Sequence, residues 1–373
     1  MRILLAGIYE SPEIRKGGPP AVFSNIVEAI SKYEFKHTLD IVSQSFFKNG
    51  DIKLGRSIFV IRVPIFNLFK LFFVIKMVLS KKYDIINLHG VSDLNTLLAF
   101  LGKLSGSIVI YSAHGLILNE MRMGSRYPLR LLLEERIIIK LSHCLVTVSR
   151  KFKEEIHRRL NYPKEKIYVI HNGISEDWFQ SNRNYFDVNV SNPYLLFVGE
   201  TTILKGFDIL LKAFNLVKKM NRSLKLVVVG KKPRNTLLVN AGEFVSDIIF
   251  IEKPIRKDVL KQLYRNALAL VLPSRQESFG LVVLEALSQG TPVIVSNSVG
   301  AAEILENGKY GLMFESGNPK DLHKCIEIIL RDEALRRRAF TEGPIFAASR
   351  TWRRVLEHYI KLFEVIKGEQ YDN

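Results

Sequence analysis

Two glutamates separated by seven residues, Glu277 and Glu285, are the side chains of this sequence best placed to do chemistry. The apolar run 269–272 predicts a strand, and a helix is expected from about Phe279 until Gly290 ends it. The first N–H groups of a helix lack partners within the helix and attract anions. This run therefore predicts a site for a diphosphate at the helix start, with a carboxylate on each side of it.

The two carboxylates have different expected partners. Glu285, about one and a half turns into the helix, can accept two hydrogen bonds from a ribose, whereas Glu277 would meet a sugar attached to the diphosphate. Gly280 has no side chain and lets the anion approach the backbone. The alternative is a pair of surface acids on an ordinary helix. The residues predicted to bind this ligand are Glu277, Ser278, Phe279, Gly280, Leu281 and Glu285.

Two histidines follow predicted strands. His114 comes after the run 108–112 and before Gly115, where a loop can present it to a ligand. We predict a functional role for His114, and the alternative is a buried structural histidine. His89 ends the run 85–88 and is predicted either to line a ligand-binding site or to be structural.

The chain alternates short apolar runs with longer helical stretches, the pattern of parallel strands covered by helices on both faces. A first series of strands is expected at residues 3–6, 38–42, 58–63, 85–88, 108–112, 144–148 and 167–170. A second series is expected at 194–198, 225–229, 248–251, 269–272, 292–295 and 311–314. Each series predicts an α/β, Rossmann-like doubly wound domain, which binds ligands at the carboxyl ends of its strands.

The domain boundary is expected in the segment 175–192, which is rich in Asn, Ser and Asp and interrupts the alternating pattern. A chain of 373 residues is also longer than one hydrophobic core usually supports. We therefore predict two domains, 1–175 and 176–351, facing each other across a cleft. A final helix is expected at about 352–373.

The composition is that of an ordinary globular protein, with 47% hydrophobic and 24% charged residues. Cys144 and Cys325 have neither a CxxC partner nor a histidine at metal-ligand spacing, which argues against a disulfide scaffold and a zinc site. Such cysteine usage is typical of a reducing compartment, so a cytoplasmic location is expected. The apolar start, residues 1–7, lacks the layout of a signal peptide and predicts a first buried strand.

The net charge of +17 is concentrated in the first half of the chain. Residues 1–175 hold 26 basic and 14 acidic side chains, a net charge of +12, whereas the remainder holds 28 and 23. Such a field attracts phosphorylated substrates or an anionic membrane surface, and the alternative is that it serves solubility alone. Nucleic acid is not expected as a partner, because the chain shows no recognition motif for it.

The segment 65–79 is unusually apolar, since twelve of its fifteen residues are hydrophobic. It is too short to span a bilayer, and its polar residues form no clean stripe. We expect a helix buried within the first domain. The alternative is a helix face that enters the membrane interface beside Lys81 and Lys82.

The order and spacing of several motifs resemble the retaining glycosyltransferases of family GT4, which have the two-domain GT-B fold. The resemblance covers nearly the whole chain and no single motif carries it. The motifs are Gly17-Gly18-Pro19-Pro20, His114-Gly115, His171-Asn172-Gly173-Ile174, Phe197-Val198-Gly199 with Lys205-Gly206, the run from Glu277 to Glu285, Gly300-Ala301-Ala302-Glu303, and Trp352 with the final helix.

The resemblance implies a nucleoside-diphosphate sugar as donor and a glycan or lipid-linked acceptor bound by the first domain. It also implies retention of the anomeric configuration without a metal ion or a separate cofactor, and the chain has no Asp-x-Asp pair that would hold Mg²⁺. The positions implied are Gly17, Gly18, Gly199 and Lys205 for the diphosphate, His114, Glu277 and Lys205 for catalysis, Lys253 and Pro254 for the base, and His89, Arg122 and Arg126 for the acceptor. For the two arginines the alternative is a solvated helix face.

One position departs from the family pattern, because Glu200 stands where an arginine usually follows Gly199. Arginine would grip a diphosphate with two hydrogen bonds, whereas a carboxylate repels it. Either Lys205 and the helix amides hold the diphosphate alone, or the loop is shifted, or catalysis is weak or lost.

The main hypothesis is a retaining glycosyltransferase at the cytoplasmic face of a membrane, building a cell-surface polysaccharide of the O-antigen, capsule or lipopolysaccharide type. One alternative is a non-hydrolysing nucleotide-sugar epimerase, which uses the same fold. The other is a non-catalytic nucleotide-sugar-binding subunit, which Glu200 motivates.

Overall fold

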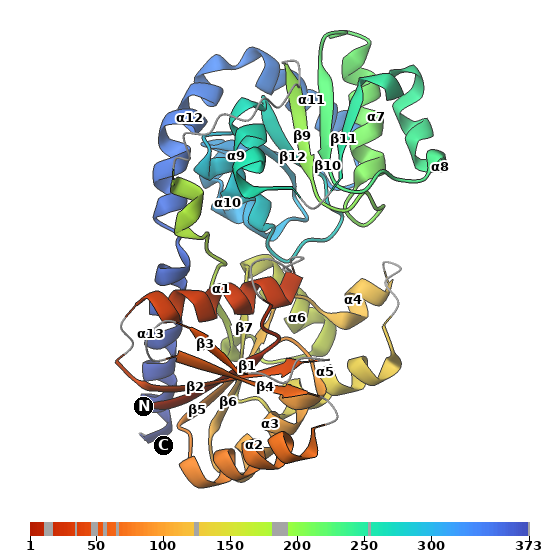
Figure 1. Ribbon diagram of the computed structural model, residues 1–373. Coiled ribbons are helices and arrows are strands. Elements are labelled where there is room, and N and C mark those ends of the chain that lie inside the picture. Colours follow the sequence, from red (N-terminus) through yellow and green to blue (C-terminus); the bar gives the residue numbers. More distant parts are fainter. Residues whose placement is uncertain are drawn as a thin grey trace. The chain divides into compact units, whose positions relative to one another are not determined.

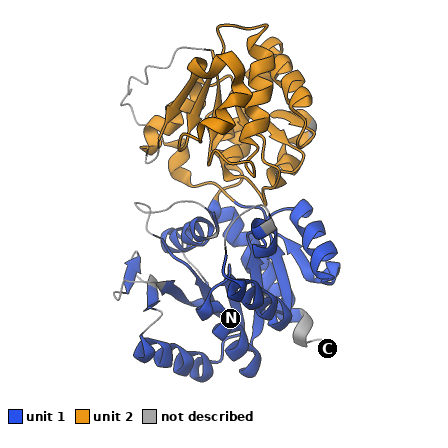
Figure 2. Ribbon diagram, turned by 90° about the vertical axis from the view of Figure 1, so that its right-hand side faces the viewer, with its two compact units in different colours: residues 1–172, 352–373 blue, residues 173–351 orange. Residues whose placement is uncertain are grey.

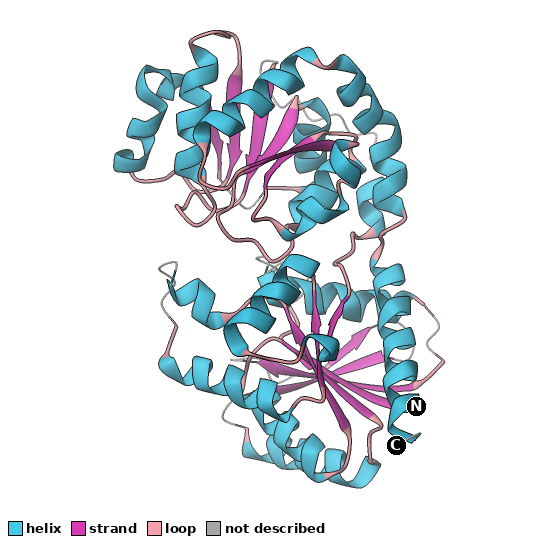
Figure 3. Ribbon diagram, turned by 180° about the vertical axis from the view of Figure 1, so that it is seen from behind, coloured by secondary structure: helices cyan, strands magenta, loops and turns pink. Residues whose placement is uncertain are grey.

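The computed structural model describes residues 1–10, 18–33, 36–45, 51–54, 58–64, 67–122, 127–180, 193–252 and 255–371. The chain forms two compact units (Figure 2), residues 1–172 with 352–373 (unit 1) and residues 173–351 (unit 2). Each unit is a largely parallel sheet covered by helices (Figures 1 and 3). Most of the segment in which the domain boundary was predicted, 181–192, lies outside the described residues.

The sheet of unit 1 has the strand order β3-β4-β2-β1-β5-β6-β7-β8. Its strands are β1 (Arg2–Gly7), β2 (Thr38–Ser45), β3 (Ile52–Leu54), β4 (Ile58–Pro64), β5 (Ile85–His89), β6 (Ile108–Ala113), β7 (Cys144–Thr147) and β8 (Ile167–Val169). All pair in parallel except β3, which runs antiparallel to β4.

The helices of unit 1 form two layers. They are α1 (Gly18–Lys32), α2 (Leu68–Lys81), α3 (Asp93–Leu104), α4 (Ile117–Arg122), α5 (Leu129–Leu141), α6 (Arg150–Leu160) and α13 (Trp352–Tyr371), with a 3₁₀ turn η1 (Lys164–Lys166). The chain moves along the sheet in opposite directions after β1 and after β5, so right-handed crossovers place α1 and α3 on opposite faces. Helix α13 packs against α1, and α2 and α5 both pack against α3 (Figure 1).

The sheet of unit 2 is entirely parallel, in the order β11-β10-β9-β12-β13-β14. Its strands are β9 (Tyr194–Val198), β10 (Lys225–Val229), β11 (Ile248–Ile251), β12 (Ala269–Leu272), β13 (Val293–Ser296) and β14 (Gly311–Phe314). Its helices are α7 (Phe207–Lys218), α8 (Asn235–Leu238), α9 (Lys257–Asn266), α10 (Leu281–Ser288), α11 (Pro319–Arg331) and α12 (Glu333–Ala348), with 3₁₀ turns η2 (Glu176–Phe179), η3 (Val239–Asp247), η4 (Gly300–Ile304) and η5 (Glu306–Gly308).

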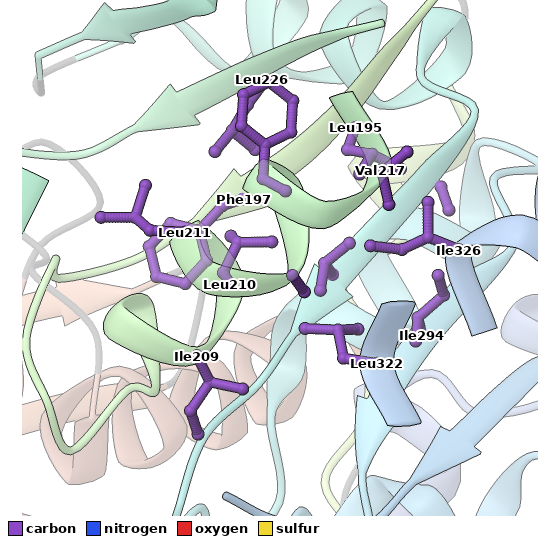
Figure 4. Close-up of a cluster of buried hydrophobic side chains, with 14 of the residues drawn as sticks. Leu195, Phe197, Ile209, Leu210, Leu211, Val217, Leu226, Ile294, Leu322 and Ile326 are labelled. Carbon is purple, nitrogen blue, oxygen red and sulfur yellow. The ribbon is translucent and has the colours of Figure 1, made fainter. Parts of the chain in front are cut away.

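One core layer of unit 2 lies between the sheet and the helices α7 and α11 (Figure 4). Its fully buried members include Leu210 of α7, Ile326 of α11, Phe197 of β9 and Leu226 of β10. Because both faces of β9 and β10 are covered, their residues are almost continuously apolar, and that continuity made the strands visible in the sequence.

All thirteen predicted strands are present, most with the predicted bounds or within a residue or two of them. The short edge strand β3 was not predicted, because three residues are too few to show an alternating pattern.

The prediction of a buried helix over residues 65–79 is wrong in one respect. The helix α2 is present, but only its inner face, with Val74, Met77 and Val78, is buried. On its outer face Leu68 is 77% exposed and Phe69 is 81% exposed. The helix is apolar on both sides, so hydrophobicity alone could not indicate which side the fold covers.

Candidate active site

The loop between β12 and α10 carries Glu277, and its backbone is fixed by a neighbouring segment. The N–H of Gly300 donates to the Glu277 carbonyl at 2.9 Å, and the N–H of Ala301 donates to the Phe279 carbonyl at 2.8 Å. Gly280 has a φ of +99°, and a Cβ there would lie 2.9 Å from a leucine side chain of β12. A glycine is therefore needed for the chain to turn from this loop into α10.

Helix α10 begins at Leu281, slightly later than the predicted start near Phe279. The side chain of Phe279 is only 2% exposed and is part of the core. Gly280 is the N-cap residue and has no side chain to satisfy the first amides of the helix. The helix start can therefore still offer N–H groups to an anion, one turn before Glu285.

Lys205 and Glu277 form an ion pair, with 2.5 Å between Nζ and Oε2. They belong to the loops after β9 and β12, which are adjacent strands, so the pair lies at the carboxyl edge of the sheet. Their side chains are 29% and 21% exposed, which leaves the pair accessible to a ligand. A diphosphate that engages Lys205 would draw the ammonium from Glu277 and leave that carboxylate able to accept hydrogen bonds from a sugar.

Arg275 fixes the Lys205 loop to the Glu277 loop. Its guanidinium donates two hydrogen bonds to the Asp208 carboxylate, at 2.6 and 2.8 Å, and its N–H donates to the Leu204 carbonyl at 2.9 Å. Gly206 lets the two loops touch, since a Cβ there would lie 1.9 Å from the Pro273 carbonyl oxygen. These contacts set the spacing between Lys205 and Glu277.

Glu285 is held by a buried tyrosine. The hydroxyl of Tyr264, on α9, donates to Glu285 Oε2 at 2.9 Å, and burial together with the Glu285 charge raises the pKa of Tyr264 well above its usual value. The ring of Trp178 packs edge-on against that of Tyr264, with centroids 5.8 Å apart. Glu285 is therefore fixed in orientation before any ligand binds.

Glu200 is exposed at the end of β9, and its carbonyl accepts the N–H of Thr202 at 2.9 Å. The hydroxyl of Thr201 donates to the Lys231 carbonyl, at 2.7 Å, and ties this loop to the one that follows β10. The carboxylate of Glu200 thus stands at the same edge of the sheet as Lys205, in place of a cation.

In unit 1, five side chains form a hydrogen-bonded series that ends on His114. Tyr359 of α13 donates to Ser112 Oγ at 3.2 Å, and Ser112 donates to Asn87 Oδ1 at 2.8 Å. Asn87 Nδ2 lies 3.1 Å from His89 Nε2, and His89 Nδ1 lies 3.1 Å from His114 Nε2. The two imidazole rings stack with an angle of 17° between their planes.

This series assigns the protons of both histidines. Asn87 accepts from Ser112 through its oxygen, so its amide nitrogen donates to His89 Nε2. His89 then carries its proton on Nδ1 and donates it to His114 Nε2. His114 in turn carries its proton on Nδ1, which is buried and has no hydrogen-bond partner among the described residues. His114 therefore presents one N–H donor in a fixed direction.

Both histidines are neutral in this arrangement. Burial, followed by the effect of the neighbouring His114, lowers the pKa of His89 well below its usual value. Burial also lowers the pKa of His114 to about 4. Near neutral pH this pair can donate a hydrogen bond but carries no positive charge.

Glu135 of α5 holds the segment that follows His114. Its two carboxylate oxygens accept the N–H of Ile117, the first residue of α4, at 3.3 and 3.2 Å. Burial of the carboxyl raises the pKa of Glu135 to about 7. A buried acid thus supports the loop that carries the neutral histidine.

Sequence comparisons match both units to families of one enzyme class. Residues 34–178 match the sequence model described as Glycosyltransferase Family 4, and residues 179–344 match that described as Glycosyl transferases group 1. This chain belongs to the GT4-like glycosyltransferases.

Individual relatives agree with this family. The chain is 31% identical to an uncharacterized glycosyltransferase of Methanocaldococcus jannaschii over 204 residues, 52% of each chain. It is 28% identical over 258 residues to the capsular polysaccharide biosynthesis glycosyltransferase CapM of Staphylococcus aureus, covering 65% of this chain and 66% of CapM. The matches thus span between about half and two thirds of the length of these curated relatives.

A solved structure supports the predicted GT-B fold. The structure of Anabaena HepE in complex with UDP aligns with a TM-score of 0.73 at 16% identity, covering 98% of this chain and 100% of that one. The predicted fold class, two Rossmann-like α/β domains of the GT-B type, is confirmed.

Several site residues predicted for this glycosyltransferase form two groups, one within each unit. Unit 2 brings Lys205, Glu277 and the start of α10 to one sheet edge, and unit 1 brings His89 to His114. Gly18 opens α1 with a φ of +70°, and Arg122 is the last residue of α4. Four predicted positions lie outside the described residues: Gly17, Arg126, Lys253 and Pro254.

The residues that position these groups were not identified from the sequence. They are Asn87, Ser112, Glu135, Asp208, Tyr264, Arg275 and Tyr359. Arg275 lies two residues before Glu277, so the sequence already showed a cation close to the predicted site. The others belong to no motif. Among the described residues, no group of three or more His, Cys, Asp or Glu side chains is arranged to hold a metal ion.

Proposed function

We propose that this chain transfers a sugar from a nucleoside diphosphate to a hydroxyl group of a glycan or lipid-linked acceptor. The observation that carries the proposal is the accessible Lys205–Glu277 ion pair at the sheet edge where α10 begins. In the reaction the bond between the anomeric carbon and the diphosphate breaks, and a bond from the acceptor oxygen forms. The acceptor proton leaves with the diphosphate or to solvent.

The charged groups suit the departure of the diphosphate. Negative charge grows on the leaving oxygen, and Lys205 together with the amides at the start of α10 stabilises it. Glu277 accepts hydrogen bonds from the sugar hydroxyls, and Glu285, already oriented by Tyr264, accepts them from the ribose. In this scheme fixed protein charges stabilise the leaving diphosphate, a task that a bound divalent cation performs in metal-dependent enzymes. We therefore propose a reaction that needs no metal ion.

The neutral histidine suits the sugar. The Nδ1–H of His114 donates to a sugar hydroxyl or a phosphate oxygen without adding charge beside the anomeric carbon, where positive charge develops. We further propose retention of the anomeric configuration, as the family membership suggests. The UDP of the HepE structure supports a UDP-sugar as the first donor to try. The name of CapM supports an acceptor in cell-surface polysaccharide synthesis. We further propose that the chain works at the cytoplasmic face of a membrane.

Donor screening followed by product analysis tests this function. Thermal shift with UDP-, GDP-, ADP- and dTDP-sugars should raise the melting temperature with one base preferred. NMR of the product should show the donor's anomeric configuration, and chelation by EDTA should leave the rate unchanged. Turnover of the free donor to an epimer without acceptor would instead identify an epimerase.

Two substitutions test the site itself. Glu277→Ala and His114→Ala should each lower the transfer rate about 100-fold or more. Glu243→Ala and His358→Ala, at exposed positions, serve as matched controls and should retain the wild-type rate. Full activity in both site variants would contradict the assignment.

Glu200 favours a second candidate, a subunit that binds the nucleotide sugar without turning it over. Calorimetry would then show donor binding while no transfer is detected with any acceptor. In that case Glu200→Arg, which supplies the missing cation, should tighten donor binding about tenfold. Turnover by the wild-type chain removes this candidate.

A further inference from the structure

The outer face of α2 is apolar and uncovered in unit 1. Five large hydrophobic side chains on this face are exposed, Leu68, Phe69, Phe72, Phe73 and Leu79. At 100° per residue they fall within one arc of about 140°, and Lys76 lies in the middle of it. We call these six residues the α2 face.

The α2 face reaches the upper end of the size range of hydrophobic patches on ordinary monomers. Phe69 is 81% exposed and Phe72 is 65% exposed. With about 200 Å² for each fully exposed large side chain, the five together expose on the order of 600 Å². Patches beyond a few hundred Å² mark surfaces that bind another molecule or a membrane.

The two neighbouring helices extend this apolar surface. Helix α3 packs against α2, and α5 packs against α3. Phe100 and Leu104 of α3 are exposed, as are Leu129, Leu133 and Ile137 of α5. The three helices therefore present exposed apolar side chains from one layer of the unit.

The charges of this layer are almost all positive. Helix α2 contains no acidic residue, and the two glutamates of α5 are buried. The acid at the start of α3, Asp93, is neutralised by Arg130 at 3.0 Å. Four cations, Lys76, Lys103, Arg136 and Lys140, are exposed and make no ion pair within the described part of the chain.

We propose that the α2 face docks on the surface of an anionic lipid bilayer, with the neighbouring surfaces of α3 and α5 beside it. Its aromatic and leucine side chains enter the acyl boundary, and the lysines and arginine meet the lipid phosphates. The helix has 14 residues and lies along the interface, because it is too short to cross the hydrocarbon core. Within the described residues, no helix combines the length and the hydrophobicity needed to cross a membrane.

A second copy of the chain is a less suitable occupant of this surface. A symmetric dimer through the α2 face would bring Lys76 and Lys103 of each copy near the same cations of the other. No acidic residue of α2 could offset that repulsion. An anionic bilayer satisfies both the apolar area and the charge.

Arg130 of α5 adds little to the positive charge of this layer, because it is paired with Asp93 and with Glu134, which lies 3.4 Å from its Nε. The apolar side chains of α2 carry the proposal, and the cations of the layer add to it.

Flotation of the full chain with vesicles tests the proposal. The wild-type chain should bind phosphatidylcholine vesicles that contain about 30% phosphatidylglycerol more tightly than pure phosphatidylcholine, and salt should weaken the binding. Phe69→Ser combined with Phe72→Ser should lower the partition coefficient about tenfold or more, since each buried phenylalanine supplies a large part of the affinity. Lys76→Gln should lower it about fivefold on anionic vesicles alone.

The controls use equally exposed apolar residues elsewhere. Val239→Ser and Ile345→Ser lie in unit 2, at positions 76% and 72% exposed, and should leave vesicle binding unchanged. All variants should keep the wild-type rate of donor turnover in solution without vesicles. A wild-type chain that binds vesicles but shows no donor turnover would count against the proposed function and leave the membrane surface standing.

A fluorescent reporter adds a direct measurement. Both native tryptophans, Trp178 and Trp352, are buried. A Phe69→Trp variant would therefore carry one exposed tryptophan, on the α2 face. The emission of the Phe69→Trp variant should shift to the blue when anionic vesicles are added. Binding that the double serine variant retains, an unshifted emission from the Phe69→Trp variant, or a wild-type dimer that the serine variant abolishes would each overturn the proposal.

Discussion

The two units hold their candidate catalytic groups in opposite electrostatic ways. In unit 2, Lys205 and Glu277 form a partly exposed ion pair, and the Arg275–Asp208 ion pair holds their two loops together. In unit 1, His89 and His114 are neutral and are held by hydrogen bonds that continue into the core. The ion pair of unit 2 can rearrange when a charged ligand binds. The histidine pair of unit 1 keeps its N–H donor on the same nitrogen with any ligand.

The difference matches the two tasks of the proposed reaction. A leaving diphosphate needs opposite charge close to it, and a partly exposed lysine can exchange a carboxylate for a phosphate at little cost. A hydrogen-bond donor to a sugar needs direction more than charge, and a series of neutral groups fixes which nitrogen holds the proton. Each arrangement can be broken separately, which makes the comparison testable.

The largest effect is expected from removing the cation of unit 2. Lys205→Ala should lower kcat/KM about 10²- to 10³-fold, because the leaving diphosphate loses its main charged partner. Steady-state kinetics with the preferred donor measures it. Lys219→Ala removes an equal charge from an exposed position of the same unit and should leave the rate nearly unchanged.

A double variant sharpens this result. Lys205→Ala with Glu277→Ala should cost less than the sum of the two single effects, because the two side chains act as one pair. Additive losses would mean that the two residues work independently of each other.

The second effect comes from the buried acid of unit 1, Glu135. Its folded pKa of about 7 lies above the usual 4.5, so the folded chain holds this proton more tightly than the unfolded chain does. The contribution of Glu135 to the free energy of unfolding should fall as pH rises from about 4.5 to about 7, by about 3 kcal/mol. Glu135→Gln should be more stable than the wild type by that amount at about pH 8 and nearly equal to it at about pH 4.5.

Urea unfolding at several pH values measures this difference. Glu165→Gln, at an exposed position in the same unit, should change stability little at any pH. Parallel stability curves for wild type and Glu135→Gln would show that the carboxyl titrates normally in the folded chain.

The fold was largely predictable from the sequence because parallel strands in covered sheets are continuously apolar, as in β9 and β10. The exposure of α2 was not, since a helix that is apolar on both faces carries no information about which face is covered. Side-chain pairings were equally hidden. Lys205 and Glu277 were both singled out, but 72 residues separate them, and nothing in either motif shows that they touch.

The positioning groups of unit 1 show the same limit. His89 and His114 stood out because each follows a strand, whereas Tyr359 reaches Ser112 from 247 residues away along the chain. Ordinary serine, asparagine and tyrosine side chains acquire their role only through tertiary contacts. The proton assignment of His114 therefore required the structure.

The smallest effects are expected along this neutral series. His89→Phe keeps a ring in place but removes the N–H that His114 Nε2 accepts, so His114 can take either tautomer and kcat should fall about tenfold. Tyr359→Phe removes only the far end of the series, where Ser112 still donates to Asn87, and should lower kcat less than about threefold.

Nitrogen-15 NMR of the His114 ring shows whether His89 acts by fixing the tautomer of His114 or only by packing against it. In the wild type, the His114 ring should carry its proton on Nδ1 alone. In His89→Phe it should show a mixture of the two tautomers. In His89→Gln, whose amide can still donate to His114 Nε2, the spectrum should return toward that of the wild type. A His114 ring protonated on Nε2 in the wild type would contradict the neutral series, whatever the rates.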